Sequence, residues 1–308
     1  MTHASGTAGA RIADYWLHEE LPARSTEIAY RATHRVLPRR ARLAIVSPAC
    51  VGGRSAEVQL MREACVLETL HHPGMPRVFE CGVFERRPWV AGEHVTGTSI
   101  EEFAAEGPLP IGEVLAVVRD AAAVLAHAHH RGVVHGGLTP RSIVRTPERG
   151  FPVCITAWGD ASLHDGHDRA PPRPDDPGAR FYRAPELAGE GRGDGPADVF
   201  ALGAVMFEAA TLVLPEPVQK FPGVPAAFHE LLASMLARDP ADRPAARVVH
   251  AEAARLAELY SDADAAIEEV EVELVDLISR TQTPPNLGWI PPEHIVSARG
   301  PPRRREEP

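Results

Sequence analysis

The hydrophobic pattern of the chain changes near residue 96, and this change constrains the fold more than any other feature. Between Tyr15 and Val95 the apolar residues form short runs rich in β-branched and aromatic side chains, which is typical of strands. From Ile100 onward the runs are long and rich in alanine, which is typical of helices. A chain of 308 residues is long enough to bury a sizeable core.

The first part is expected to form a small sheet that carries one helix. The expected strands are EIAYRAT, RLAIVSP, RVFECGVFE and PWVAGEHV, at residues 27–33, 42–48, 77–85 and 88–95. The expected helix is AEVQLMREACVLETLHH, residues 56–72, where apolar residues recur among charged neighbours.

The second part is expected to be helical. Its helices are predicted at residues 110–132, closed by Gly132 as a cap, at 198–214 and at 226–238. The stretch DGHDRAPPRPDDPGAR, residues 165–180, is expected to be a long loop. After about Tyr260 comes an acidic stretch, for which the pattern favours a helix over a strand, and then the proline-rich PPNLGWIPPEH.

Composition excludes several classes of function. The net charge of −10 argues against nucleic acid as the main partner, because phosphate binding needs clustered positive charge. No apolar run approaches the roughly 20 residues that span a bilayer, and we expect no secretory signal. The four cysteines are scattered and the histidines of HAHHRG lack a zinc-ligand spacing, so we expect a cytoplasmic protein without a metal site.

Five segments, in order, resemble the protein kinase family over residues 15 to about 256. They are MREACVLETLHHPGMPRV (helix C region), AHAHHRGVVHGGLTPRSIV (catalytic loop), GARFYRAPEL (end of the activation segment), DVFALGAVMFEAAT (helix F) and LARDPADRP (late C-lobe motif). The resemblance implies a bilobal α+β fold: a small N-lobe antiparallel sheet with helix C, and a larger, mainly helical C-lobe. We expect a disordered tail at 1–13, a domain at 14–256 whose lobes meet near residue 95, and an acidic and proline-rich tail at 257–308.

The resemblance also shows which chemical groups are missing. Phosphoryl transfer depends on positioning and charge stabilisation, supplied by a glycine-rich loop, a lysine, metal-binding Asp and Asn, and an Asp that orients the hydroxyl. The glycines align with Pro22, Arg24 and Glu27, and the lysine aligns with Val46. The only lysine of the chain, Lys220, lies in the other lobe, so Glu63 is retained without the lysine that would pair with it.

The catalytic loop and the segments after it show the same losses. The hydroxyl-orienting Asp, the following Lys and the metal-binding Asn align with Gly137, Thr139 and Ser142. The metal-binding Asp of D-F-G aligns with Ala157, and Ala179 replaces the threonine expected near the end of the activation segment.

The groups retained are those with a structural role in the family. Glu186 is expected to pair with Arg243, and Asp198 to accept N–H bonds from the catalytic loop, with His135 packed beneath it. We therefore expect a pseudokinase of the bacterial Ser/Thr kinase-like branch, without a cofactor, that acts as a protein-binding scaffold or allosteric regulator. Its partner could engage the helix C face, the loop 165–180 or the C-terminal tail.

One alternative is an atypical Ser/Thr kinase or ATP-binding protein in which ATP and Mg²⁺ are held by relocated groups. Arg24 or Arg42 would then reach phosphate, and Asp160 would bind metal. The simpler interpretation of Asp160, which we favour, is a solvated loop acid. A second alternative is a purely structural module inside a larger assembly.

Overall fold

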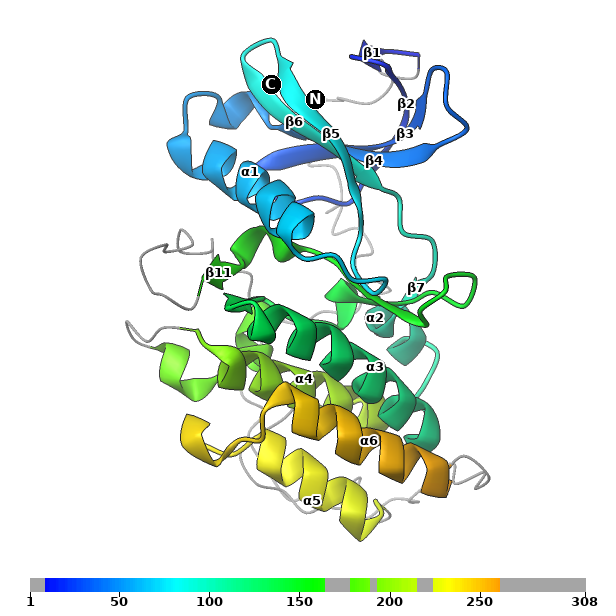
Figure 1. The fold of residues 1–308 in the computed structure, drawn as a ribbon, viewed down its shortest axis with the longest axis vertical. Helices are drawn as coiled ribbons and strands as arrows, with labels where there is room; N and C mark the ends of the chain where they lie inside the picture. The colour runs from blue at the N-terminus through cyan, green and yellow to red at the C-terminus, as the bar shows by residue number, and fades with distance from the viewer. Residues whose placement is uncertain (1–8, 164–177, 189–192, 215–223, 261–308) are drawn as a thin grey trace, which may run out of the picture. The chain divides into compact units, whose positions relative to one another are not determined.

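The first part of the chain forms an antiparallel sheet that carries one helix, as predicted. The structure is a computed structural model that describes residues 9–163, 178–188, 193–214 and 224–260. Within these residues the first sheet has six strands in the order β1-β2-β3-β4-β6-β5, with α1 (Arg54–Thr69) beside it (Figure 1). The strands are β1 (Arg11–Ile12), β2 (Tyr15–Leu21), β3 (Glu27–His34), β4 (Arg40–Val46), β5 (Val78–Phe84) and β6 (Arg87–Glu93).

The two faces of this sheet have different roles because side chains alternate along each strand. Leu43 and Ile45 of β4 point to a face that buries an aromatic and aliphatic core with Tyr15 and Trp89. Residues Ala44 and Val46 point to the opposite face and pack against Ala56 and Leu60 of α1. Thus β4 joins the sheet core to the helix.

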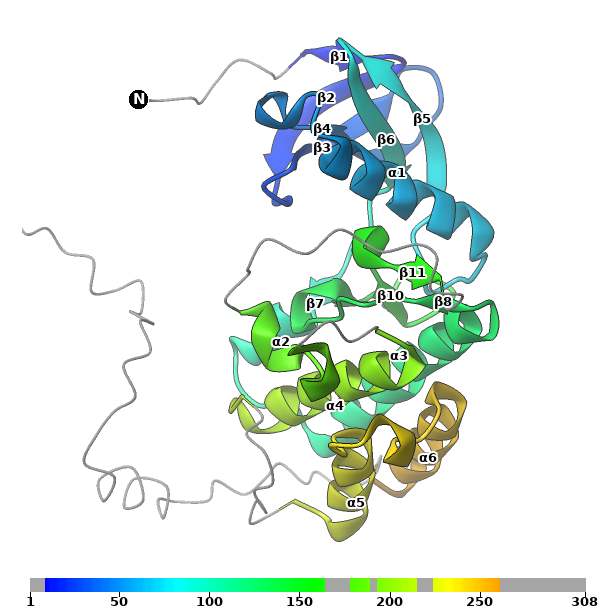
Figure 2. The same cartoon turned by 90° about the vertical axis from the view of Figure 1, so that its left-hand side faces the viewer.

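The second part is mainly helical, with α3 and α4 at its centre. Its longer helices are α3 (Ile111–His130), α4 (Gly195–Thr211), α5 (Ala226–Met235) and α6 (Ala246–Tyr260), and α2 (Ile100–Ala104) is short. Figures 1 and 2 show α6 beside α3, and these helices share the largest hydrophobic core with α4 and α5. Short strands line the side that faces the first sheet: β7 (Thr98–Ser99), β8 (Val133–Val134), β9 (Ile143–Arg145), β10 (Val153–Ile155) and β11 (Ser162–Leu163).

The predicted strands and helices lie where the sequence placed them, but two boundaries were wrong. Strand β1 lies inside the predicted tail 1–13, because Ile12 is buried in the core of the sheet. Helix α6 continues to Tyr260, beyond the predicted limit of 256. Gly132 has a φ of +72° and ends α3 as predicted. Most of the loop 165–180 and the acidic stretch after Tyr260 lie outside the described residues.

Asp198, at the start of α4, fixes the loop that resembles a catalytic loop. Its carboxylate accepts hydrogen bonds from the backbone N–H of His135 (2.8 Å) and Gly136 (2.9 Å) and from Nε2 of His129 (2.8 Å). Burial alone would raise the pKa of Asp198, but these donors and the nearby histidines hold that pKa below its ordinary value.

The ring of His135 lies under the same loop and is held from both sides. Its Nδ1 accepts a hydrogen bond from the N–H of Gly137 (3.2 Å), so Nε2 carries the proton and donates to the carbonyl of Thr156 (3.0 Å). The edge of the ring meets Trp158 at a centroid distance of 4.6 Å. The loop is therefore anchored by polar bonds to α4 and to the segment after β10.

Glu186 and Arg243 form a bidentate ion pair. Nη1 and Nη2 of Arg243 lie 2.6 and 2.8 Å from the two carboxylate oxygens of Glu186. The arginine side chain is fully buried and also donates to the carbonyls of Ala237, Pro196 and Arg238. This geometry ties the segment at Glu186 to the turn before α6.

Arg243→Ala should destabilise the protein because it leaves the Glu186 carboxylate and three carbonyls without their donor. Loss of one partner of a buried pair costs about 3–5 kcal/mol, so the melting temperature should fall by several degrees. Arg255→Ala is the matched control, because it removes an exposed arginine whose ion pair is with Glu252 on the same helix. Equal melting temperatures for both variants would contradict the structural role of Arg243.

Asp198→Asn should make the stability of the protein less dependent on acid pH. The lowered pKa of Asp198 contributes stability that is present above the pKa of an unfolded Asp, about 3.9, and is lost as the pH falls through the folded value. Calorimetry from pH 7 to pH 3 should therefore show wild type and variant converging below about pH 4. A constant difference in melting temperature across this range would show that the carboxylate charge is not what stabilises the loop.

Candidate functional site

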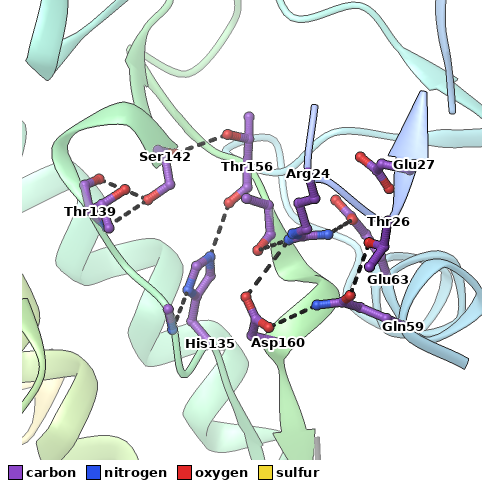
Figure 3. Close-up of polar contacts among 12 residues, drawn as sticks. Arg24, Thr26, Glu27, Gln59, Glu63, His135, Thr139, Ser142, Thr156 and Asp160 are labelled. Carbon is purple, nitrogen blue, oxygen red and sulfur yellow. Dashed lines mark hydrogen bonds and ion pairs between the residues drawn. The ribbon is translucent and has the colours of Figure 1, made fainter. Parts of the chain in front are cut away.

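The side chain of Arg24 occupies the region between the first sheet and the second part of the chain. Arg24 lies in the loop between β2 and β3, at a position that resembles a glycine of a phosphate-binding loop. Its Nη1 donates to Oε2 of Glu63 on α1 (3.1 Å), and its Nη2 donates to the carbonyl of Ala157 (3.2 Å) and lies 3.9 Å from Oδ2 of Asp160 (Figure 3). One guanidinium group thus contacts three positions.

The surroundings of Arg24 fit a permanent positive charge. Burial alone would lower the pKa of the guanidinium, but the carboxylates of Glu63 and Asp160 raise it. The space comes from Gly159, where a Cβ atom would lie only 2.3 Å from Nη1 of Arg24. Any side chain at position 159 would displace the guanidinium.

Asp160 is buried, so our interpretation of this residue as a solvated loop acid was wrong. Its Oδ1 accepts a hydrogen bond from Nε2 of Gln59 on α1 (3.0 Å), and its Oδ2 faces Arg24. The hydroxyl of Thr26 donates to the amide oxygen of Gln59 at 3.4 Å, which extends the network toward β3 (Figure 3).

Glu63 also differs from its expected state, because Arg24 takes the place of the missing lysine as its partner. Gln59 and Glu63 are four residues apart and therefore share one face of α1. That spacing is the signal by which Gln59 could have been found from the sequence.

A second ion pair lies on the same face of the sheet as Val46. Nη2 of Arg42 is 2.8 Å from Oε1 of Glu27, and the glutamate is buried. Glu27 is opposite Val46 in the β3–β4 register, and Arg42 is four residues before Val46 along β4, so all three share one face. The negative charge expected at Glu27 is therefore matched by Arg42.

The remaining altered positions bond to their own neighbours or carry no polar side chain. The hydroxyl of Ser142 donates to the carbonyl of Thr139 (2.8 Å) and accepts from its N–H (3.0 Å). Val46 is fully buried against α1, and Ala157 has a left-handed backbone with φ +66°. Two further positions lie at the surface or in a turn: Pro22 is exposed before β3, and Ala179 begins a 3-10 turn, Ala179–Tyr182.

The chemistry of the site follows from these contacts. Both arginines that could serve phosphate are paired with carboxylates, and Asp160 is held by Gln59 and Arg24. Among the residues that the structure describes, no group of three or more His, Cys, Asp or Glu side chains could hold a metal ion. The same part of the chain contains no helix long and apolar enough to cross a membrane.

Comparison with known proteins gives a consistent result. The sequence-family model of the protein kinase domain matches residues 51–253 of this chain. The serine/threonine-protein kinases PknJ, PknI and PknL of Mycobacterium tuberculosis are 28%, 28% and 27% identical to this chain. These matches cover 81%, 63% and 74% of this chain, but only 46%, 32% and 62% of the respective relatives. The chain thus spans less than two thirds of the length of each.

The fold comparison covers the same region. A crystal structure of the M. tuberculosis PknI kinase domain matches with a TM-score of 0.64 and 26% identity, over 82% of this chain and 99% of the PknI domain. The matched family model, the relatives and the shared fold agree: the chain belongs to the protein kinase family.

Proposed function

We propose that this chain is a pseudokinase, a kinase fold that binds a protein partner as a scaffold or allosteric regulator and does not transfer phosphate. The observation that carries the proposal is the ion pair of Arg24 with Glu63, next to Asp160. The side chains that could hold phosphate or metal in this chain are bonded to one another instead.

Nucleotide binding through Arg24 or Asp160 would have to break these bonds. For Arg24 to bind phosphate, its guanidinium would have to leave Glu63, whose side chain is only 17% exposed. A buried carboxylate left without its partner costs about 3–5 kcal/mol, and this partly exposed pair would cost less but still disfavour binding. A metal at Asp160 would in addition displace the amide of Gln59.

Catalysis faces a further obstacle at the loop that follows His135. Gly137 stands where an Asp would orient the substrate hydroxyl, and Ser142 is turned toward Thr139. Phosphoryl transfer depends on positioned charge, and these positions offer none.

The retained anchors support a binding role. Asp198 and the Glu186–Arg243 pair keep the loops of the second part in place although the catalytic groups are absent. The proposal includes a cytoplasmic location, no cofactor and no nucleic-acid partner. The acidic and proline-rich segment 257–308 is our candidate docking segment for the protein partner.

A second candidate function is an atypical Ser/Thr kinase or ATP-binding protein. The observation that favours it is that the guanidinium of Arg24 lies near the carboxylates of both Glu63 and Asp160. The matched relatives are named serine/threonine-protein kinases. In this candidate Arg24 would bind phosphate and Asp160 would bind Mg²⁺.

ATP with Mg²⁺ or Mn²⁺ should not change the melting temperature of the full chain. A ligand that binds only the folded state stabilises it by about 2.7 kcal/mol at a hundredfold excess over its Kd, which is a shift of several degrees. Thermal denaturation with and without millimolar ATP and metal measures this directly. A metal-dependent rise would contradict the proposal and support the second candidate.

Incubation with labelled ATP should yield no phosphate transfer to the chain itself or to a generic protein substrate. The physical reason is that Gly137 stands in place of the hydroxyl-orienting Asp and Val46 in place of the lysine. Asp160→Ala is the discriminating variant, because it removes the carboxylate nearest to a metal-binding position. Transfer by the wild type that this substitution abolishes would show that the chain is an enzyme.

A further inference from the structure

Arg24 joins three segments that are far apart in the sequence. It starts in the loop between β2 and β3, reaches Glu63 near the middle of α1, and reaches Ala157 and Asp160 in the segment after β10. Figure 3 shows its guanidinium between the helix and that segment.

Two further bonds fasten α1 to the same segment. Gln59 donates to Asp160 (3.0 Å), and Nη1 of Arg62 donates to the carbonyl of Ala161 (3.2 Å). All three contacts come from one stretch of α1, between residues 59 and 63, and all three end between residues 157 and 161. A rotation of α1 away from the second part of the chain would break them together.

The chain after α1 is fixed to the second part by a different arginine. Nη1 of Arg149 pairs with Glu93 at the end of β6 (2.7 Å), while its Nη2 donates to the carbonyls of Pro73 (2.7 Å) and Met75 (3.1 Å). The segment that leaves α1 is therefore held independently of Arg24.

We propose that Arg24 is an internal latch that replaces a bound ligand and holds α1 in one position against residues 157–161. This inference rests on the proposed function, since it assigns to Arg24 a positioning role in a cleft without nucleotide. The α1 surface is then offered to a protein partner in a single state. Arginine suits this task because its planar fork bonds a carboxylate and a carbonyl at once.

The position of Gly159 is the second observation behind the latch. If Gly159 carried a Cβ atom, its three nearest atoms would all belong to the guanidinium of Arg24, at distances of 2.3–3.0 Å. A substitution here pushes the guanidinium of Arg24 away from its position. The residues Arg24, Glu63 and Asp160 are all still present in such a variant. Gly159→Ala therefore tests the contact without deleting any member of it.

Hydrogen–deuterium exchange of the full chain should detect release of the latch. Arg24→Ala should raise the exchange rate of amides in α1 about tenfold, because the helix then opens locally at lower free energy. Arg42→Ala is the matched control: it also removes an arginine from an ion pair on this face of the sheet, but Arg42 pairs within the sheet, with Glu27. It should leave exchange in α1 unchanged.

Gly159→Ala should reproduce the effect of Arg24→Ala, and it serves as the deciding variant if Arg24→Ala does not fold. Unchanged exchange in α1 in the folded variants, or equal increases in the Arg42→Ala control, would overturn the latch. This outcome differs from failure of the proposed function, which is a thermal shift of the wild type by ATP with metal.

Discussion

A partly buried carboxylate on α1 and a buried carboxylate after β10 lie against one guanidinium group, that of Arg24. Glu63 on α1 and Asp160 after β10 both contact its guanidinium. Without that charge, the two acids would repel each other in a region of low dielectric, where unpaired charge is costly. The same carboxylate of Asp160 also accepts the bond from Gln59, so Arg24 and α1 meet at one buried acid.

The replacement of lysine by arginine affects several positions on this side of the sheet, in addition to the lysine position itself. Val46 of β4 packs against α1 where a lysine would stand. Arg24 reaches Glu63 from the loop between β2 and β3 instead. Arg42 with Glu27 repeats this pattern on the same sheet face. Arginine keeps its charge at all relevant pH values and bonds in two directions, so it favours fixed internal pairs over exchangeable ligands.

Much of the fold could be predicted from the sequence, because hydrophobic spacing and five ordered segments constrain it together. The pairing of Glu186 with Arg243 and the bonds to Asp198 were expected and lie where expected. The sequence places Arg24 at a glycine position and offers it as a phosphate ligand only in the alternative, and it offers Asp160 as a solvated acid or, in the alternative, a metal ligand. Position-by-position comparison assigns each residue the role of its own position, but a long side chain can act several ångströms away.

A double-mutant cycle between Arg24 and Glu63 measures directly how strongly these two side chains stabilise each other. The unfolding free energies of the wild type, Arg24→Ala, Glu63→Ala and the double variant give the energy that couples the two side chains. We expect a coupling energy of about 1–3 kcal/mol, since the two side chains are in contact and partly buried. Additive effects, within about 0.5 kcal/mol, would contradict it.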